Sequence, residues 1–389
     1  MVFSNIEFKN FYKKKKLFKV KKILNRILVN YSKGNNLILL SLSKKYKYSF
    51  KFQNLKRYKK FKHFKIFGMG GSSLGAEAIY FFLQKKIKKK FQFVNNINLS
   101  KKENFKNTEF NIIISKSGNT LETLSNLNSQ KIKNNCLFIT ENRKSYLRNL
   151  ALKLKSEIID HNNLIGGRYS VLSETGMIPA FFMGLDPNKF KRLDNLISSK
   201  KFINYLIFNV SSIISFHQNH KHNSIILNYD ENSSNLFYWY QQLVAESLGK
   251  SSKGILPIIS TVPRDNHSLM QLYLDGFKKN FFTFFYVKDN NSKKIDNNTL
   301  LDSHSYLRNK KMSDVMYSQF RATQNVFLKK KIPFRSFVIK KKDEKTLGEL
   351  FAFFILETIL LGEALKINPY NQPAVELIKT ETFKILKKN

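Results

Sequence analysis

The residues best suited to chemistry lie in a polar loop, Ser115 to Thr120, which follows an apolar run. The loop contains three hydroxyl side chains, one lysine and one glycine, and a helix is expected to begin at Leu121. Backbone amides and the helix dipole at such a start favour an anion. A helix cap needs only one hydroxyl, so the number of hydroxyls here favours a bound phosphate monoester. The loop alone therefore predicts a phosphate binder.

A glycine-rich turn over residues 68–75 follows a second apolar run and precedes another expected helix. Glycine lets the backbone approach a ligand closely, with amides pointing outward at the helix start. The turn is not a Walker loop, because no Gly-Lys-Ser/Thr follows it. A tight turn between a strand and a helix explains the same residues equally well, so this signal is weak by itself.

Two further segments carry groups that could stabilise charge or move a proton. Arg168 follows Gly166 and Gly167, and an arginine beside glycines can bring a fixed cation and an amide to one anionic oxygen; an incidental arginine in a surface turn is the alternative. Gln242 and Glu246 lie four residues apart on an expected helix over residues 236–248, so they share a face. Glutamate is suited to removing a proton next to a carbonyl, although an isolated helical glutamate is usually only solvated.

The remaining candidates carry little signal alone. His267 opens an expected helix after a loop, where a residue beside the helix cap is the ordinary interpretation. Gln372 and Lys379 place an amide and an amine near the end of the chain. In so lysine-rich a sequence, Lys379 by itself indicates nothing.

Strand-like and helix-like segments alternate along the chain, which is typical of parallel α/β sheets. The expected strands cover residues 64–67, 110–114, 136–140, 224–229, 255–259, 281–287 and 334–339. The expected helices cover residues 74–83, 236–248, 267–276, 313–328 and 346–361, with one more from Leu121. Two α/β units in tandem follow from this rhythm, after a lysine-rich segment of about 60 residues that is helical at best. In such units ligands bind beyond the carboxyl ends of the strands.

The composition excludes some functions and leaves others open. Lys and Arg number 68 against 27 Asp and Glu, a formal charge of +41. This excess is spread along the chain and accompanies no nucleic-acid-binding motif, so a compositional bias explains it better than an RNA or DNA partner.

The single Cys136 lies in an apolar run, which predicts a buried structural thiol in a reducing cytoplasm. The apolar stretch near residues 350–365 contains two glutamates and predicts a buried helix instead of a membrane span.

Taken together, residues 64–379 resemble the glucose-6-phosphate isomerase family. The strongest matches are Gly166 to Ser170 and the C-terminal pattern of Gly362, residues 370–372, residues 374–376 and Lys379. The resemblance implies two tandem sugar-isomerase α/β sandwich domains with parallel sheets, an N-terminal extension and a C-terminal helical tail. The expected bounds are 1–60 for the extension, 61–200 and 201–345 for the two domains, and 346–389 for the tail that completes the active site.

The resemblance also implies a role for each candidate residue in the interconversion of glucose 6-phosphate and fructose 6-phosphate. Glu246 would move a proton between C2 and C1, Arg168 with the Gly167 amide would face the enediolate oxygens, and His267 with Lys379 would open the ring. The residues expected to bind substrate are Gly71, Ser72, Ser115, Lys116, Ser117, Thr120, Gly167, Gln242 and Gln372. No metal or organic cofactor is implied, and the family pattern predicts a homodimer in which His267 reaches the partner's site.

The sequence departs from the family pattern at Glu174, where a small residue would be expected, and its N-terminal region looks short. Three alternatives remain at this point. A dual phosphoglucose/phosphomannose isomerase shares the polar loop, and a sugar-phosphate sensor shares the domain type. The third alternative is RNA binding driven by the charge of +41. The combination of Glu246, His267 and Lys379 favours the enzyme over the sensor.

Overall fold

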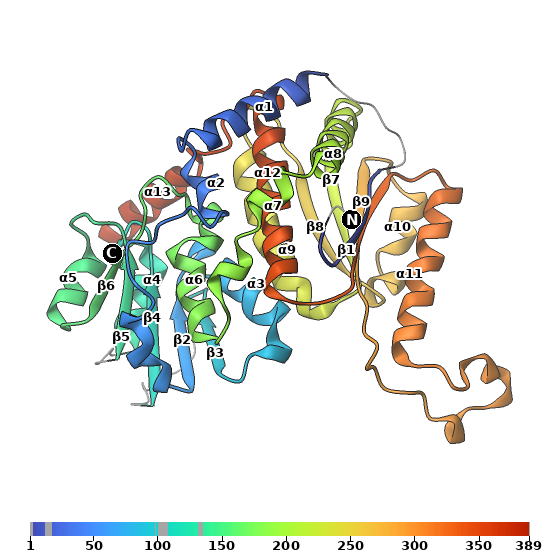
Figure 1. Cartoon of the computed structure of the whole chain (residues 1–389), viewed down its shortest axis with the longest axis horizontal. Coiled ribbons are helices and arrows are strands. Elements are labelled where there is room, and N and C mark those ends of the chain that lie inside the picture. The colour runs from blue at the N-terminus through green and yellow to red at the C-terminus, as the bar shows by residue number, and fades with distance from the viewer. Residues whose placement is uncertain (1–2, 12–17, 98, 100–107, 131–134, 389) are drawn as a thin grey trace.

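Two five-stranded sheets form the two halves of the molecule, with helices between and around them (Figure 1). The computed structural model describes residues 3–11, 18–97, 99, 108–130 and 135–388. Its mixed α/β architecture with parallel strands confirms the predicted fold class.

The first sheet has the strand order β3-β2-β4-β5-β6, and all of its strands run parallel. Its strands are β2 (His63–Phe67), β3 (Lys90–Val94), β4 (Glu109–Ile114), β5 (Cys136–Thr140) and β6 (Glu157–Asp160). The strand order reverses between the neighbours β2 and β4. The loops that follow these two strands therefore border the crevice in which ligands of open parallel sheets bind. They are the glycine-rich turn and the polar loop that begins at Ser115.

The second sheet has the order β1-β10-β9-β7-β8. Its parallel strands are β7 (Asn223–Asn228), β8 (Leu256–Thr261), β9 (Asn280–Val287) and β10 (Phe334–Ile339). The fifth strand, β1 (Ile6–Lys9), pairs antiparallel with β10 and comes from the segment that was expected to be helical at best. The alternation of apolar and polar residues covers only four positions, which is a weak strand signal in a lysine-rich stretch, and the pairing with β10 establishes the strand.

Helices cover both faces of the sheets, which is why strands such as β5 are apolar and buried throughout. The helices are α1 (Phe18–Ser32), α2 (Leu37–Ser41), α3 (Leu74–Phe82), α4 (Leu121–Ser129), α5 (Tyr146–Lys153), α6 (Glu174–Phe182), α7 (Leu193–Ile197), α8 (Lys200–Gln218), α9 (Ser234–Leu248), α10 (Met270–Asp275), α11 (Met312–Lys329), α12 (Glu344–Ala364) and α13 (Val375–Lys388). Shorter 3-10 turns lie at η1 (Asn54–Lys60), η2 (Gly70–Ser72), η3 (Gln84–Lys86), η4 (Gly167–Leu172), η5 (Pro187–Phe190), η6 (Glu231–Ser233), η7 (Arg264–His267), η8 (Asn297–Thr299) and η9 (Asp302–Leu307).

The long helix α12 lies in the middle of the molecule and packs against α1, α8 and α9. It is the apolar stretch expected to be a buried helix, and almost all of its residues are buried. Its fully buried Glu357 forms an ion pair with the fully buried Arg335 of β10, so the carboxylate has a counter-charge in the interior. Among the helices of the described residues, none combines the length and apolarity that a membrane span requires.

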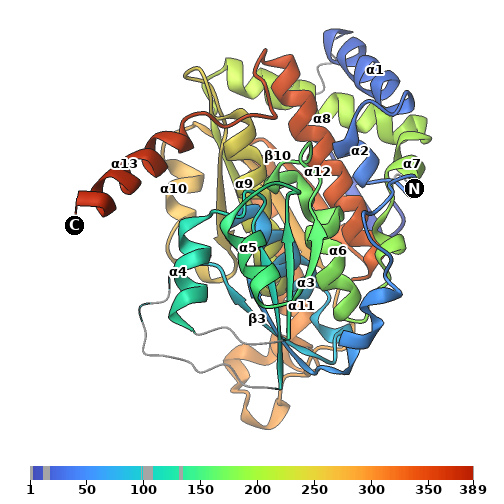
Figure 2. The ribbon, with the colours of Figure 1, turned by 90° about the vertical axis from the view of Figure 1, so that its left-hand side faces the viewer.

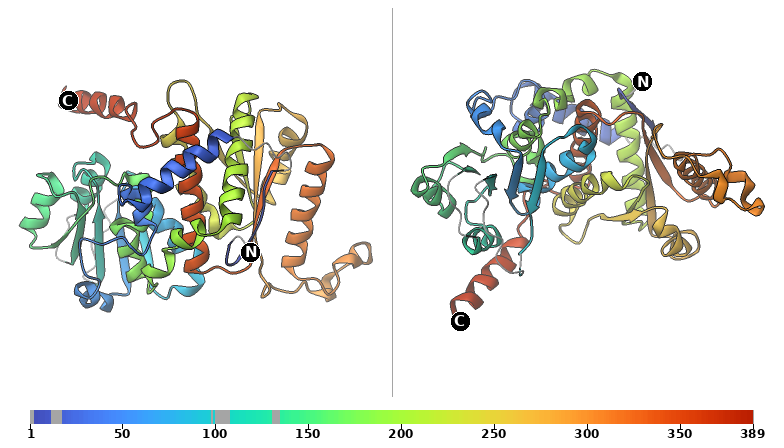
Figure 3. Two further views of the ribbon diagram at one scale, coloured as in Figure 1. Left: turned by 45° about the horizontal axis from the view of Figure 1, so that its top comes forward. Right: turned by 90° about the horizontal axis from the view of Figure 1, so that it is seen from below.

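The last helix, α13, extends away from the rest of the molecule (Figures 2 and 3). None of its described residues is buried. Apolar side chains on it are nevertheless prominent: Leu377 is 73% exposed and Ile378 is 72% exposed. This helix is amphipathic, and its apolar side chains are largely exposed in the described part of the chain.

Candidate active site

Two loops from different parts of the first half meet at the carboxyl ends of its strands. The turn η2 follows β2, and η4 follows the loop after β6; the two turns pack against each other. A β-carbon added to Gly71 would lie 2.2 Å from the carbonyl carbon of Gly167, so only glycine allows the two backbones to come this close. Gly70 has a positive φ of 53°, and a β-carbon there would lie 2.7 Å from the Gln242 amide nitrogen. The glycine-rich turn is therefore a close-approach site that joins η4 and α9.

Arg168 lies at the centre of this junction and is only 2% exposed. Its Nη1 donates a hydrogen bond to Glu246 Oε2 at 3.2 Å and another to Gln372 Oε1. Its Nε donates to Ser247 Oγ at 2.8 Å. Its Nη2 donates to the carbonyl oxygens of Pro369 at 2.6 Å and of Asn371 at 3.2 Å. These acceptors fix the planar guanidinium, as expected of a buried arginine.

Helix α9 brings the next two candidates to the arginine. Gln242 Nε2 donates to Glu246 Oε1 at 2.8 Å, which confirms that the two residues share a helical face. One Glu246 oxygen thus contacts the amide and the other contacts Arg168, while a quarter of the Glu246 side chain (26%) is still exposed. The carboxylate is held in place and remains accessible to a ligand. The amide oxygen of Gln242 is buried without a hydrogen-bond partner in the described structure, so it is available to a ligand hydroxyl.

The polar loop after β4 is open to an anion. Ser115 Oγ and Thr120 Oγ1 lie 2.7 Å apart, and Ser115 Oγ also accepts from the Gly118 amide at 3.2 Å. Gly118 adopts a positive φ of 68°, which turns the loop back toward the start of α4. Thr120 precedes α4 without capping it through its side chain, so its hydroxyl does not occupy the amides of the first helical turn. These amides and the hydroxyls form a site typical of a phosphate group.

Lys116 and Ser117 lie half-buried in the same loop. Lys116 Nζ donates to the Asn163 carbonyl at 2.7 Å and lies 3.5 Å from Glu141 Oε1. Asn163 precedes η4, so this lysine connects the polar loop to the segment that carries Arg168. Ser72, on η2, is also half-buried and belongs to the same group of strand-end loops.

His267 lies at the other end of the second sheet from Glu246. Strands β7 and β8 end side by side, with Asn228 opposite Thr261, and His267 follows within six residues of that end. Helix α9 starts near the same end, at Ser234, and runs back along the sheet. Glu246 lies twelve residues after Ser234, which is about 18 Å along the helix axis. His267 is exposed on η7 and does not reach Glu246 of its own chain.

Lys379 is also separate from the arginine. It lies one turn into α13, where its Nζ pairs with Glu376 Oε1 at 2.6 Å and its side chain is 60% exposed. The tail thus brings Gln372 to Arg168 but carries Lys379 away with the projecting helix (Figure 2).

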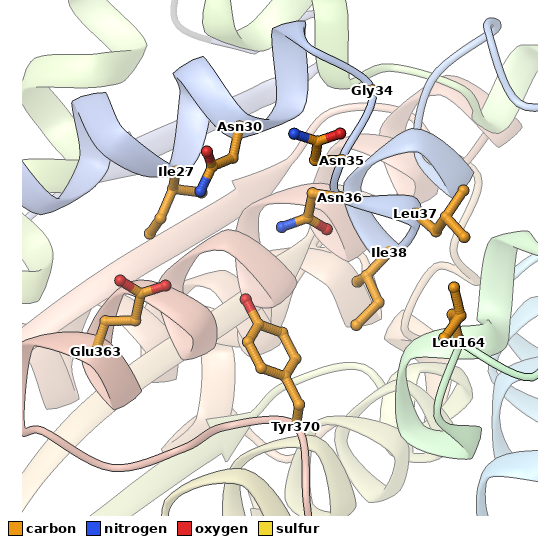
Figure 4. Close-up of a pocket in the computed structure, with 10 residues that line it drawn as sticks. All are labelled: Ile27, Asn30, Gly34, Asn35, Asn36, Leu37, Ile38, Leu164, Glu363 and Tyr370. Atoms are coloured by element: carbon orange, nitrogen blue, oxygen red, sulfur yellow. The ribbon is translucent and has the colours of Figure 1, made fainter.

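Two hollows flank these residues. One, of about 580 Å³, is lined by Gln242 and Glu246 together with Leu74 and Glu77. The other, of about 710 Å³, lies behind the C-terminal loop between Tyr370 and the turn at Asn36 (Figure 4). None of the candidate residues lines the larger hollow. The position of the reactive site is therefore inferred from where the polar groups converge, and not from the volume of a cavity.

Sequence reasoning missed two neighbours of the site. Ser247 accepts from Arg168 and lies 2.8 Å from the Tyr169 hydroxyl, although nothing in its position after Glu246 marks it. Lys250 Nζ donates to the carbonyls of Ser247 at 2.8 Å and of Asn368 at 2.7 Å. Burial and the nearby Arg168 lower the pKa of Lys250 to about 8, and Glu246 opposes this shift. A lysine among so many others gives no signal in the sequence.

Cys136 lies away from these groups in β5. It is buried, and this burial raises the pKa of its thiol to about 12. A thiol with such a pKa is protonated near neutrality and is a poor nucleophile, in agreement with the structural role predicted for it.

The chain is similar in sequence to known proteins over most of its length. Residues 51–389 match the family described as phosphoglucose isomerase. The chain is 32% identical over 360 residues to the glucose-6-phosphate isomerase of Methanocaldococcus jannaschii, covering 86% of this chain and 88% of that one. It is 30% identical over 374 residues to the glucose-6-phosphate isomerase of aster yellows witches'-broom phytoplasma, covering 87% and 88%.

Solved structures share the fold at lower identity. A hypothetical protein of Thermus thermophilus matches with a TM-score of 0.81 at 20% identity, over 95% of this chain and 94% of that one. A glucose-6-phosphate isomerase of Chlamydia trachomatis matches with a TM-score of 0.66 at 18% identity, over 99% and 81%.

Proposed function

Because the chain belongs to the phosphoglucose isomerase family, we propose that the groups around Arg168 interconvert glucose 6-phosphate and fructose 6-phosphate. The observation that carries this proposal is the buried guanidinium of Arg168, held between the Glu246 carboxylate and the Gln372 amide. A fixed cation beside an accessible carboxylate suits a reaction in which a proton leaves carbon and negative charge develops on oxygen.

The substrate phosphate would lie in the loop of Ser115, Lys116, Ser117 and Thr120, against the first turn of α4. Gly71 and Ser72 would border the near end of the sugar, because η2 follows β2, the neighbour of β4, and packs against the turn η4 that carries Arg168. Gln242 and Gln372 would hold hydroxyl groups. Phosphate binding far from the reacting carbons would orient C1 and C2 at Glu246.

In the chemical step, Glu246 removes the proton from C2 and returns it to C1, through a cis-enediol. C2 is oxidised and C1 is reduced within one molecule, so the reaction as a whole needs no external oxidant or reductant. Arg168 and the Gly167 amide stabilise the charge on the enediolate oxygens. A fixed donor of this kind is typically worth about 3–4 kcal/mol in the transition state.

Ring opening requires His267 and Lys379, and neither lies beside Glu246 in its own chain. We therefore propose a homodimer in which His267 of one subunit enters the site of the other. The exposed apolar side chains of α13 support a second copy as partner, since a helix with such a face is stabilised by burying it. Movement of α13, which begins three residues after Gln372, would bring Lys379 to the sugar. A cytoplasmic location also stays a prediction, supported by the single buried thiol.

A coupled assay with fructose 6-phosphate, which detects glucose 6-phosphate, tests the function. The Glu246→Gln variant keeps the size of the side chain and one accepting oxygen but removes the base, so turnover should fall by about 10²-fold or more while substrate still binds. Glu231→Gln, an exposed substitution just before α9, is the matched control and should retain full activity. Full turnover by Glu246→Gln would refute the assignment of the base. A parallel reaction with mannose 6-phosphate measures how strongly the site discriminates between the two configurations at C2.

A further inference from the structure

A buried cluster of charged and aromatic side chains lies beneath η4, on the side away from Glu246. Lys191 is 3% exposed, and its Nζ donates hydrogen bonds to the carbonyl oxygens of Leu172 and Ser41. Leu172 is the last residue of η4, and Ser41 is the last residue of α2. One ammonium group therefore ties the end of the arginine-bearing turn to the N-terminal segment.

A second contact joins the same two segments. Glu174, the first residue of α6, is 1% exposed, and its two oxygens accept from the Tyr46 hydroxyl at 3.0 and 3.1 Å. The rings of Tyr46 and Tyr48 lie 5.0 and 4.9 Å from Lys191 Nζ, within the range of a cation–π contact. The cluster thus contains one buried cation, one buried anion and two aromatic rings around the junction of η4 with α6.

The two charges depend on each other. Burial lowers the pKa of Lys191, and the negative charge of Glu174 opposes that shift. Burial raises the pKa of Glu174, and backbone hydrogen bonds, the hydrogen bond from Tyr46 and, least of these, the charge of Lys191 oppose that shift. A buried charge without a nearby opposite charge is costly, so removal of Lys191 leaves Glu174 less well compensated, and removal of Glu174 does the same to Lys191. A lysine amine, moreover, still has two hydrogens when it is neutral, enough for both carbonyls.

Arg168 is the second residue of η4, four residues before Leu172. The beginning of η4 is held by the contacts of Arg168 with α9 and with the C-terminal loop. The end of η4 is held by the hydrogen bond from Lys191 to the Leu172 carbonyl. A short 3-10 turn has few internal hydrogen bonds to keep its shape, so anchoring both ends fixes where the guanidinium lies.

We propose that Lys191, in the buried cluster that contains Glu174, is a positioning residue for the isomerase reaction and acts by anchoring the η4 turn that carries Arg168. The proposal rests on the proposed function, because it assigns the reacting role to Arg168. Lys191 touches no substrate. Its effect should fall on turnover, where the position of the arginine matters most, and much less on phosphate binding in the loop after β4.

The test compares Lys191→Met with Lys189→Met in the fructose 6-phosphate assay. Lys189 lies two residues away with a half-exposed side chain, so its substitution controls for the loss of one positive charge. We expect Lys191→Met to lower kcat by about 10- to 100-fold with KM changed less than about threefold, and Lys189→Met to change neither. Wild-type kcat in folded Lys191→Met would overturn the proposal.

A double variant separates positioning from simple loss of stability. Below pH 7, where Lys191 is charged, Lys191→Met leaves the buried Glu174 without the nearby ammonium group, whereas adding Glu174→Gln removes the carboxylate and should restore the urea midpoint. The Leu172 carbonyl remains without its anchor in the double variant, so kcat should stay low although stability recovers. Recovery of kcat together with stability would overturn the proposal. If neither Lys191 variant folds, the kcat of Tyr46→Phe is measured instead, because this substitution removes the hydroxyl that contacts Glu174. A severalfold loss of kcat supports the role of the cluster, and a wild-type kcat contradicts it.

Arg168→Lys is measured in parallel to keep the two claims apart. If Arg168→Lys retains full activity, the assignment of the reacting arginine fails. If Arg168→Lys loses activity while the Lys191 variants keep it, only the positioning role fails.

Discussion

Gly71 and Gly167 lie in direct backbone contact, so close that a β-carbon on Gly71 would lie 2.2 Å from the Gly167 carbonyl carbon. No side-chain rotation relieves a clash with backbone, so Gly71→Ala must push η2 and η4 apart. We expect kcat/KM for fructose 6-phosphate to fall by about 10- to 100-fold, because Arg168 follows Gly167 directly. Gly166→Ala is the matched control: its β-carbon would meet only the Tyr169 ring, at 3.7 Å, and its φ of −66° suits alanine. Equal activity of the two variants would contradict this account.

Arg168→Lys should lower kcat by about 10²- to 10³-fold, as loss of a fixed donor at a developing oxyanion does. Lysine keeps the charge but has one nitrogen, which cannot serve acceptors as widely spread as Ser247, Glu246 and Pro369. The control is Arg57→Lys, a substitution of an exposed arginine in η1, before β2. Steady-state kinetics of the two variants are compared, and Arg57→Lys should retain the wild-type kcat. An Arg168→Lys enzyme with undiminished kcat would show that the guanidinium geometry is irrelevant to turnover.

Thr120→Val removes one hydroxyl from the proposed phosphate loop without changing the size of the side chain. We expect KM for fructose 6-phosphate to rise about tenfold with a smaller change in kcat, because a phosphate contact stabilises ground state and transition state alike. Ser125→Ala, exposed on the next turn of α4, should leave KM unchanged. An unchanged KM in Thr120→Val would indicate that the substrate phosphate binds outside this loop.

Complementation between inactive subunits tests the shared active site. Glu246→Gln and His267→Ala should each be inactive as homodimers. Equal co-expression should restore about a quarter of wild-type activity, since half of the dimers are hybrids and each hybrid has one site with both groups intact. Mixtures that stay inactive although hybrid dimers form would contradict the contribution of His267 across the interface.

The buried Lys191 predicts a pH dependence of stability. Burial lowers the pKa of Lys191 in the folded protein to about 7, whereas an unfolded lysine titrates near 10.4. Between these two values the unfolded chain holds a proton that the folded chain has released, so this group makes the free energy of unfolding rise with pH. Urea midpoints at pH 7 and pH 9 should therefore rise more in the wild type than in Lys191→Met. Parallel changes in both proteins would indicate that Lys191 titrates normally.

The candidate site could be predicted from the sequence only where a segment carries its own signal. The loop after β4 is such a segment, because its hydroxyls, its glycine and the helix start that follows are all neighbours in sequence. The pairing of Gln242 with Glu246 was predictable for the same reason, since helical spacing fixes which side chains share a face. The antiparallel strand β1 was not predictable, because β10, the strand with which it pairs, lies more than 300 residues away.

The sequence by itself thus determined the alternation of strands and helices, the family and the local motifs, because hydrophobic periodicity and turn chemistry act over a few residues. Only the tertiary structure decided which motifs meet. It placed Arg168 against Glu246 and Gln372, separated His267 and Lys379 from them, and buried Lys191 with Glu174 beneath the arginine turn. These relationships depend on strand order, on the direction of α9 and on close backbone packing. Those are properties of the packed chain as a whole, and no short stretch of sequence encodes them.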